Sequence, residues 1–436
     1  MSQRAWTRRD FLSGATKAIG LTSLGIIGSD VIAACTTGTS GTSGGPVEIV
    51  WQSHVTPNYT VEFWQGLIDK FQQLHPDIKI KRVAAPNTDP DTFVRTLLAG
   101  GAMPDVVMSI AVSNFIDALR PLAIDSTIQK IKHYKDLEIK GKLYTVGSGL
   151  QPLSLVFYNR DLFDKAGITS EPATLSDFEN AMQRLKSAGI APMIVAGEWV
   201  PGHVFGNAVG GPNVFSQSPT FWSDFNSKKA SMADREWLAA AKSYASWAHN
   251  GYFNKGGLGD GYAQGEQNFL AGRGAIYPMG IWFTGSLATT PPPFKVGVFP
   301  MPTSSGEKVM CVDYGRPPIA VSATSKNPQA AIAFAEFLAL DPYAHSRIIQ
   351  KDGLLSDLEP PSTYTMIPAQ QTIFDSLKTY KTISSADGTG DSIPIPGFLD
   401  QLNNAAQKIM LGGDPLQEMQ KLDAFRDQYI QTHPQA

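Results

Sequence analysis

The chain has 436 residues, 42% of them hydrophobic and 17% charged, and a formal net charge of −3. Single hydrophobic cores stop growing near roughly 250–300 residues, so this length favours two or three domains. The composition excludes a disordered chain and a protein with many membrane spans. The charge balance gives no basic surface for nucleic acid, so we expect no nucleic-acid partner.

Residues 1–34 have the features of an export signal. Arg8 and Arg9 precede a weakly apolar run, residues 18–29, which is too short and too rich in small and polar residues to span a bilayer stably. The paired arginines resemble a twin-arginine signal, and the sequence IAAC, which ends at Cys35, resembles a bacterial lipobox. We expect cleavage before Cys35 and a lipid on its thiol; a short N-terminal helix is the alternative.

Residues 35–46 are expected to be a lipid-anchored, flexible tether. After Cys35 the sequence reads TTGTSGTSGGP, which cannot bury enough surface to fold. A lipid followed by such a tether would hold a globular body close to the outer face of the cell membrane, at the cell surface or in the periplasm. The other cysteine, Cys311, then has no partner for a disulfide, and we interpret it as a small buried side chain.

From residue 47 the sequence alternates between strand and helix patterns. Strands are predicted at 47–53, 78–85 and 105–110, and amphipathic helices at 60–76 and 91–104. Regular alternation of this kind indicates a parallel, doubly wound α/β sheet, with ligand loops at the carboxyl ends of the strands.

A different pattern separates this region from a second α/β stretch at 294–340. Residues 153–292 contain long helix patterns and short apolar strand patterns, of which the strands are predicted at 191–197 and 274–280. We therefore expect two lobes, each built from segments that are not contiguous in the chain.

Five segments occur in a fixed order: LLAGGAMPDVV, GKLYTVGSGLQPLSLVFYNRDLFDKAGI, FLAGRGAIYPMGIW, KVGVFPMP and ATSKNPQAAIAFAEFLAL. In this order they resemble the family 1 extracellular solute-binding proteins of ABC importers, the maltose-binding-protein-like lipoproteins that mostly bind sugars. The resemblance implies a two-lobed periplasmic-binding-protein-like fold of type II. Each lobe would be a mostly parallel sheet flanked by helices, with the ligand cleft between the lobes.

The resemblance also implies boundaries and partners. We expect lobe 1 to comprise residues 47–150 and 296–340, and lobe 2 to comprise 151–295 and 341–436. The lobes would close over a carbohydrate, and the closed form would deliver it to the transmembrane permease subunits of the importer. We expect a monomer that needs no cofactor, no metal and no catalytic group.

Aromatic rings are the first candidates for contacts with a sugar, because they offer flat apolar surfaces to the C–H faces of pyranoses. Trp282 follows a predicted strand and matches the family position whose aromatic ring stacks on the solute. Gly280 and Gly285 beside it are expected to let a ligand approach the backbone. Trp199 follows the segment 191–197 and could belong to the site or to the core. His203 could reach a hydroxyl, although it is typical of a surface loop.

Polar side chains after the strands of lobe 1 are the second group. His54 follows the first strand, where the family usually contributes a polar contact. Ser109, Ser113 and Asn114 follow the third strand by the same reasoning. Val112 and Ser113 stand where the maltose-type pattern has an acidic and a basic residue, which argues against a maltodextrin ligand.

A third group lies where the chain is expected to cross between the lobes. The family counterpart of Gln151 often reaches the ligand at the floor of the cleft. Asp313, Tyr314 and Arg316 precede the strand predicted at 318. Asp313 and Arg316 could form only a salt bridge, or they could grip hydroxyl groups in the plane of a sugar.

Other classes of protein and of ligand have less support. The chain has no H-E-x-x-H and no P-loop, and its seven histidines are scattered, so an enzyme that cleaves carbohydrate is the weaker alternative. A polyamine would need several carboxylates, and the strand-end loops offer few. A phosphoester would need more cations than Arg316, and iron would need clustered Tyr, His and Asp. A sensory lipoprotein with the same fold stays open.

Overall fold

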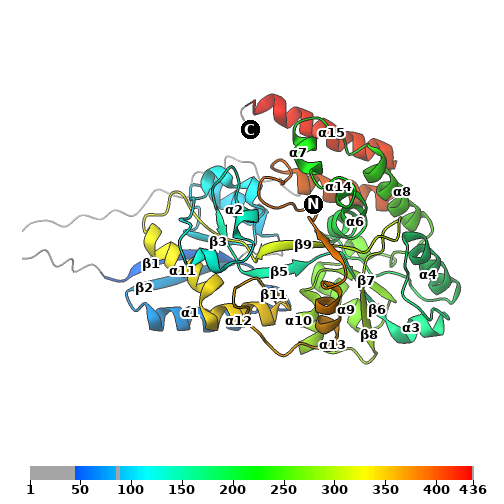
Figure 1. The fold of residues 1–436 in the computed structure, drawn as a ribbon, viewed down its shortest axis with the longest axis horizontal. Helices are drawn as coiled ribbons and strands as arrows, with labels where there is room; N and C mark the ends of the chain where they lie inside the picture. Colours follow the sequence, from blue (N-terminus) through cyan, green and yellow to red (C-terminus); the bar gives the residue numbers. More distant parts are fainter. Residues whose placement is uncertain (1–44, 85–88, 435–436) are drawn as a thin grey trace, which may run out of the picture. The chain divides into compact units, whose positions relative to one another are not determined.

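The computed structural model describes residues 45–84 and 89–434. The expected export signal, Cys35 and residues 36–44 of the tether lie outside the described residues. Three sheets and two large hydrophobic cores make up the described part (Figure 1). No helix in these two stretches is long and apolar enough to cross a membrane.

The first sheet has five strands, in the order β2-β1-β3-β10-β4. Their bounds are β1 Val47–Ser53, β2 Ile78–Ala84, β3 Val106–Met108, β4 Thr145–Val146 and β10 Ile319–Val321. β1 pairs in parallel with β2 and β3, which confirms the three strands predicted there. β10 runs antiparallel to β3 and β4. The start of β10 therefore lies beside the carboxyl end of β3.

Helices α1, Val61–Leu74, and α11, Pro328–Leu340, cover one face of this sheet. The side chain of Thr60 caps α1 by accepting a hydrogen bond from the backbone N–H of Phe63. The helix buries four apolar side chains at helical spacing, Trp64, Leu67, Ile68 and Phe71. Trp51 of β1 lies edge-on to Trp64 at 5.2 Å and to Phe334 of α11 at 5.1 Å. These residues form the first core.

The opposite face of the sheet is covered by α2, Pro90–Ala99, through Val94. Asp105, directly before β3, accepts hydrogen bonds from the backbone N–H of Val50 at 2.8 Å and from the hydroxyl of Ser325 at 2.6 Å. Its carboxylate thus fastens β1 and the approach to α11 to β3. This bonding shows a structural role for Asp105.

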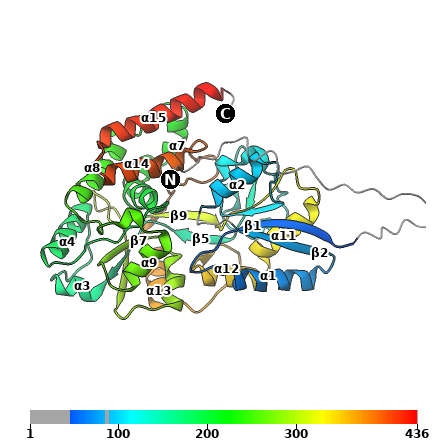
Figure 2. The ribbon, with the colours of Figure 1, turned by 180° about the vertical axis from the view of Figure 1, so that it is seen from behind.

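A second sheet, in the order β11-β5-β9-β12, lies between the two cores. Its strands are β5 Gly149–Pro152, β9 Val309–Arg316, β11 Leu355–Ser356 and β12 Lys381–Ile383. Figures 1 and 2 show β5 and β9 running between the first sheet and the region of β7. β5 pairs antiparallel with β9, so the chain crosses in both directions at this sheet.

The third sheet, β7-β6-β8, differs from the parallel sheet expected for lobe 2. Its strands are β6 Leu155–Asn159, β7 Ile276–Met279 and β8 Val296–Pro300, and β6 is antiparallel to both neighbours. The reason lies in the chain path: β6 leads away from the crossing strand β5, whereas β8 leads back to β9. The segment 191–197 forms no strand; Met193 alone makes isolated bridges with Phe253 and Ile276.

The second core surrounds this sheet and includes Phe157, Trp247 and Tyr277. The helices that contribute to it include α3 Arg160–Lys165, α4 Leu175–Ser187, α5 Val200–His203, α6 Gly211–Phe215, α7 Phe221–Asn226, α8 Arg235–His249, α9 Tyr262–Leu270, α10 Phe283–Thr289, α13 Pro368–Ser376, α14 Phe398–Met410 and α15 Pro415–Thr432. Helices α4 and α8 correspond to the long helix patterns within residues 153–292. Cys311, in β9, is fully buried, as predicted.

Two segments group differently from the boundaries expected for the lobes. Residues 296–300, which the sequence grouped with the first lobe, form β8 and pair along β6 next to the second core. Helix α12, Pro342–Lys351, was grouped with the second lobe and buries Ala344 and Ile348 in the first core.

Candidate functional site

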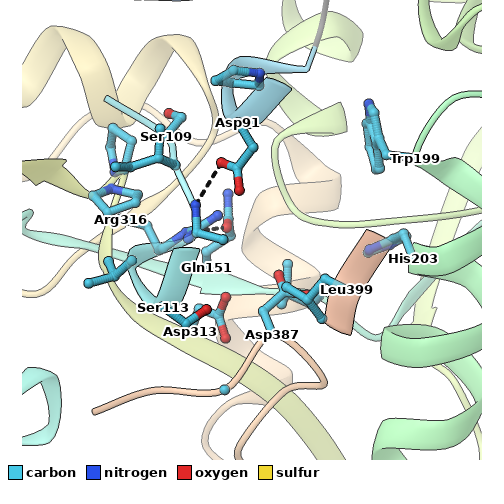
Figure 3. Close-up of a pocket in the computed structure, with 18 of the residues that line it drawn as sticks. Asp91, Ser109, Ser113, Gln151, Trp199, His203, Asp313, Arg316, Asp387 and Leu399 are labelled. Carbon is cyan, nitrogen blue, oxygen red and sulfur yellow. Dashed lines mark hydrogen bonds between the residues drawn. The ribbon is translucent and has the colours of Figure 1, made fainter. Parts of the chain in front are cut away.

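A cavity of about 640 Å³ opens where the first sheet, the crossing strands and the helices of the second core meet (Figure 3). This volume lies within the range of roughly 300–1,000 Å³ typical of small-molecule sites. All ten residues predicted to contact a ligand line it: His54, Ser109, Ser113, Asn114, Gln151, Trp199, Trp282, Asp313, Tyr314 and Arg316. The structure brings these ten residues to one cavity, and their contact with a ligand stays a prediction.

The carboxyl edge of the first sheet supplies His54 and Ser109. Because β1 and β3 are parallel neighbours, the residues that follow them emerge at the same edge. The carbonyl of His54 accepts a hydrogen bond from the indole of Trp64 at 2.8 Å. Ser109 has a positive φ of 60° and donates its backbone N–H to Pro318 at 2.8 Å. This bond joins the end of β3 to the segment that carries Arg316.

Asp91 and Asn114 form a half-buried polar contact near this edge. Asn114 belongs to a short 3-10 turn, Val112–Asn114, and donates from its amide to Asp91 at 2.5 Å. Asp91 also accepts from the backbone N–H of Ala111 at 2.9 Å (Figure 3). The oxygen of the Asn114 amide accepts from the N–H of Gly397, directly before α14. Asn114 thereby links the first sheet to a helix of the second core.

The crossing strands supply the floor of the cavity. The guanidinium of Arg316 donates to the Gln151 side-chain oxygen at 2.9 Å, so these two planar groups are held together rather than each pointing freely. Arg316 does not form the salt bridge with Asp313 that the sequence left open, because no such ion pair occurs among the described residues. Gly315 between them has φ +65°, and a Cβ there would lie 2.5 Å from Leu137.

Trp282 reaches the cavity because β7 is antiparallel to β6. Met279, at the end of β7, lies opposite Leu155 at the start of β6, so the residues after β7 emerge beside the crossing strands. Gly280 is needed for a reason other than the one expected. A Cβ at Gly280 would lie 2.0 Å from the indole of Trp282, so this glycine makes room for the ring rather than for a ligand. Gly285 likewise lies against the backbone of Lys351.

Four aromatic rings form one wall of the cavity. Trp282 lies 5.9 Å from Trp199 and 5.3 Å from His203, and Trp199 lies 5.0 Å from Tyr262. Trp199 and Trp282 are each half-buried, which leaves part of each indole open to the cavity. His203 is not in a surface loop: it ends α5 and is only 6% exposed.

A polar network around Asn58 holds the backbone of Trp282 in place. The Asn58 amide donates to the Trp282 carbonyl at 2.8 Å and to Asp352 at 2.9 Å, and its oxygen accepts from Ser286 at 2.9 Å. Asn58 follows β1, whereas Ser286 lies in α10. This network therefore fixes the backbone of Trp282 relative to the first sheet.

A second network in the cavity surrounds Asp313 and Asp387. Ser385 donates to Asp313 at 2.5 Å, and its hydroxyl accepts from the backbone N–H of Asp387 at 3.1 Å. Asn207 donates to Asp387 at 3.1 Å and accepts from the N–H of Ala386 at 2.8 Å. Asn207 belongs to a π-helical stretch, Val204–Gly210, that continues from α5. Such stretches are frequent at functional sites.

Burial controls the protonation of several of these groups. Burial lowers the pKa of His54 to about 4, with smaller contributions from Arg316 and Arg82, and lowers the pKa of His203 to about 4. Both imidazoles are therefore neutral at pH 7. Burial, and then the neighbouring Asp387, raise the pKa of Asp313 to about 7, although Arg316 opposes the shift.

The sequence did not single out several polar residues of the cavity, among them Asn58, Asp91, Asn207, Asp352 and Asp387. Asp387 lies in SADGTGD, a polar, glycine-rich loop of the kind that often carries function, so a signal was present. Asn207 and Asp352 lie in or next to helices whose sequences give no such signal. No group of His, Cys, Asp or Glu among residues 45–84 and 89–434 could hold a metal ion.

These features define an α/β protein with a cavity between two hydrophobic cores that is suited to a small molecule. The family model described as bacterial extracellular solute-binding protein matches residues 57–344, so the chain belongs to that family. The family members are binding proteins rather than enzymes.

Known relatives agree with this assignment. A "Multiple sugar-binding protein" of Streptococcus mutans serotype c (strain ATCC 700610 / UA159) is 22% identical over 286 residues, which cover 62% of this chain and 66% of that protein. The chain thus matches just under two thirds of the length of that relative.

Three solved structures share the fold. A chitin oligosaccharide binding protein has a TM-score of 0.76 at 19% identity, covering 88% of this chain and 99% of that one. A sugar transporter from Bacillus licheniformis in complex with stachyose has a TM-score of 0.70 at 18% identity, covering 87% and 98%. RafE in complex with raffinose has a TM-score of 0.65 at 19% identity, also covering 87% and 98%.

Proposed function

We propose that this protein captures a carbohydrate outside the cytoplasmic membrane and delivers it to the permease of an ABC importer. The observation that carries the proposal is the composition of the cavity. One wall is aromatic, with Trp199, Trp282 and Tyr262, and the floor has planar hydrogen-bonding groups, with Gln151 and Arg316 joined at 2.9 Å. Sugars require this combination, since their rings have apolar C–H faces and a rim of hydroxyl groups.

Capture is proposed to occur by closure of two lobes about the crossing strands. Residues from the first sheet, such as His54, and residues around the second core, such as Trp282, line the same cavity. A ligand that touches both sides binds the closed form better than the open one and so shifts the equilibrium toward closure. The sugar-binding relatives support a carbohydrate as the ligand.

Export and anchoring complete the proposal. The paired Arg8 and Arg9 and the sequence IAAC before the tether support export through the twin-arginine route and a lipid on Cys35. The protein would act as a monomer held at the outer face of the membrane. Substitution of Cys35 by Ala should release the protein from the membrane fraction, whereas retention there would contradict the anchor.

A thermal-shift screen of the purified protein against mono- and oligosaccharides tests the proposed function. A ligand present at a hundredfold its Kd should stabilise the protein by about 2.7 kcal/mol. We expect at least one carbohydrate to raise the melting temperature and to be recovered unchanged by chromatography. Stabilisation by no sugar would contradict carbohydrate capture, and recovery of cleavage products would show an enzyme instead.

A further inference from the structure

The charges that line the cavity are strongly unequal. Seven carboxylate side chains line it, from Asp89, Asp91, Glu198, Asp313, Asp352, Asp387 and Asp400, whereas Arg316 is the one Lys or Arg side chain among the described lining residues. Asp400, at the rim, pairs with Arg95 at 3.3 Å, and Arg316 donates to the neutral Gln151. Asp313 and Asp387 take part in none of the ion pairs among the described residues, so a neutral sugar would bring no positive charge to balance these two carboxylates.

Asp313 and Asp387 concentrate this charge at one place. Asp313 is only 2% exposed, and the Ser385 hydroxyl bonds to both its carboxylate and the backbone of Asp387. Figure 3 shows the two carboxylates on the same side of the cavity, one from β9 and the other from the loop before α14. Each accepts one side-chain hydrogen bond, from Ser385 and Asn207 respectively, although a carboxylate has about four acceptor positions.

His203 gives a second, independent indication of a ligand. Its side chain is buried and points into the cavity beside Asp387 and Leu399 (Figure 3). Its Nε2 atom is buried and has no hydrogen-bond partner in the described structure. A buried imidazole nitrogen without a partner costs free energy, so its position is explained by a group that a ligand brings.

The two carboxylates are short of donors rather than of acceptors, and Nε2 of His203 also accepts a hydrogen bond when the ring proton is on Nδ1. An ionised carboxylate only accepts hydrogen bonds, and a neutral imidazole has one acceptor nitrogen. Asp313, whose pKa burial and Asp387 raise to about 7, is about half ionised at pH 7, and a bound ammonium group favours its ionised form. A sugar hydroxyl brings one donor and two acceptor sites, whereas an ammonium group brings three donors and a positive charge. Charge-assisted hydrogen bonds are also the stronger ones. An ammonium group therefore matches both the hydrogen bonding and the charge of this part of the cavity.

We infer that the ligand carries a free amino group, held as an ammonium between Asp313, Asp387 and His203, so that the protein selects amino sugars over neutral or N-acetylated ones. This inference rests on the proposed function and specifies its ligand class. The ring would stack at the aromatic wall, where Trp199 and Trp282 also favour a nearby cation.

Isothermal titration at pH 7 with matched ligands tests the inference. The set is glucose, galactose and mannose with their 2-amino and 2-acetamido counterparts, together with the β-1,4-linked disaccharides of glucose, glucosamine and N-acetylglucosamine. Spermidine serves as an amine that is not a sugar. We expect an amino sugar to bind about tenfold or more tightly than both of its matched counterparts, and added salt to reduce that difference.

Substitutions test whether Asp387 and Asp313 cause the preference for the amino sugar. Asp387→Asn, at a half-buried position, and Asp313→Asn should each reduce the preference for the amino sugar, measured as the ratio of its Kd to that of the matched neutral sugar, by about tenfold. Asp375→Asn removes the same charge from the surface of α13, outside the cavity, and should keep the preference. Circular dichroism shows whether each variant is folded.

The outcomes separate the inference from the proposed function. Equal or tighter binding of the neutral or acetylated member in every matched set that binds would overturn the ammonium site and leave carbohydrate capture standing. Binding of spermidine without binding of any sugar would overturn carbohydrate capture and support the ammonium site. Binding of none of these ligands would contradict both.

Discussion

Trp282 shows how one side chain is placed for contact with a ligand. Its indole lies over Gly280, its carbonyl accepts from Asn58, and its ring faces His203 and Trp199. The ring is thus fixed before any ligand arrives, which reduces the entropy that binding would cost.

Replacement of Trp282 by Ala should weaken carbohydrate binding by about 1–3 kcal/mol, because the apolar face under the sugar is lost. Trp282→Phe keeps a flat ring and should lose less. Isothermal titration measures both, with circular dichroism as the control for folding. Wild-type affinity in a folded Ala variant would show that the ring is not part of the site.

The raised pKa of the buried Asp313 carboxyl leads to a prediction about how the stability of the protein depends on pH. Its pKa is about 7 in the folded protein and near 3.8 when exposed. Between these two pH values the folded state therefore binds a proton that the unfolded state has lost. Its contribution to stability is full below about pH 4 and is lost as the pH rises through about 7. The free energy of unfolding of Asp313→Asn minus that of wild type should therefore increase by about 1–3 kcal/mol when the pH is raised from 4.5 to 8.

Urea unfolding at the two pH values measures this difference in free energy. Asp375→Asn is the control, since that carboxylate lies on the surface and should give no gain in stability over the same pH range. A difference between Asp313→Asn and wild type that is independent of pH, or that reverses in sign, would contradict the buried, protonated state.

The sequence indicated which residues line the cavity where a residue follows a strand, or where the chain crosses between the lobes, as at Gln151 and Arg316. His54, Ser109 and Trp282 come directly after strand patterns, and all three line the cavity. Asp387 lies far along the chain from these residues, and its position depends on the path of the segment after α13. The sequence therefore suggested too few carboxylates for a cationic ligand, although the folded cavity collects seven.

At the scale of elements, Asp105 ties β1 and the approach to α11 to β3. Asp105→Ala would leave the backbone N–H of Val50 without its partner, which should lower the free energy of unfolding by about 1–3 kcal/mol. Binding should not change, because Asp105 does not line the cavity. Urea unfolding and ligand titration of the same preparation measure the two quantities.

Asp69→Ala is the matched control for that substitution, since Asp69 bonds only to the exposed Gln65 on the surface of α1 among the described contacts. Its free energy of unfolding should change by less than about 0.5 kcal/mol. A similar loss for both variants, or a change in ligand affinity for Asp105→Ala alone, would contradict a purely structural role for Asp105.

Strands and helices were predictable where the local sequence pattern is strong and the element does not depend on segments distant in the chain. β1 has the predicted bounds, and α1 buries the face that its pattern indicates. The segment 191–197 is apolar enough for a strand, yet it forms only isolated bridges at Met193, because neighbouring backbone decides whether a strand forms. The antiparallel direction of β7 and β8 depends on where the chain returns to β9, which no local pattern encodes.

At the scale of the whole molecule, the two cores are joined by the strands β5 and β9, and the cavity lies where they cross. A connection that consists of only a few strands can act as a hinge, and a ligand that touches both sides would favour the closed form. We expect the radius of gyration measured by small-angle X-ray scattering to fall when a bound carbohydrate is added. A non-binding sugar is the control, and an unchanged radius at saturation would contradict closure.

Binding with release of an unchanged ligand distinguishes a carrier from an enzyme and is therefore the most direct measurement. The protein is titrated calorimetrically with the best carbohydrate of the screen, and the ligand is then recovered and analysed by chromatography. We expect one ligand per protein, weaker binding to Trp282→Ala, and recovery of the intact sugar. Hydrolysed product, or binding that Trp282→Ala leaves unchanged, would contradict the capture of a carbohydrate in this cavity.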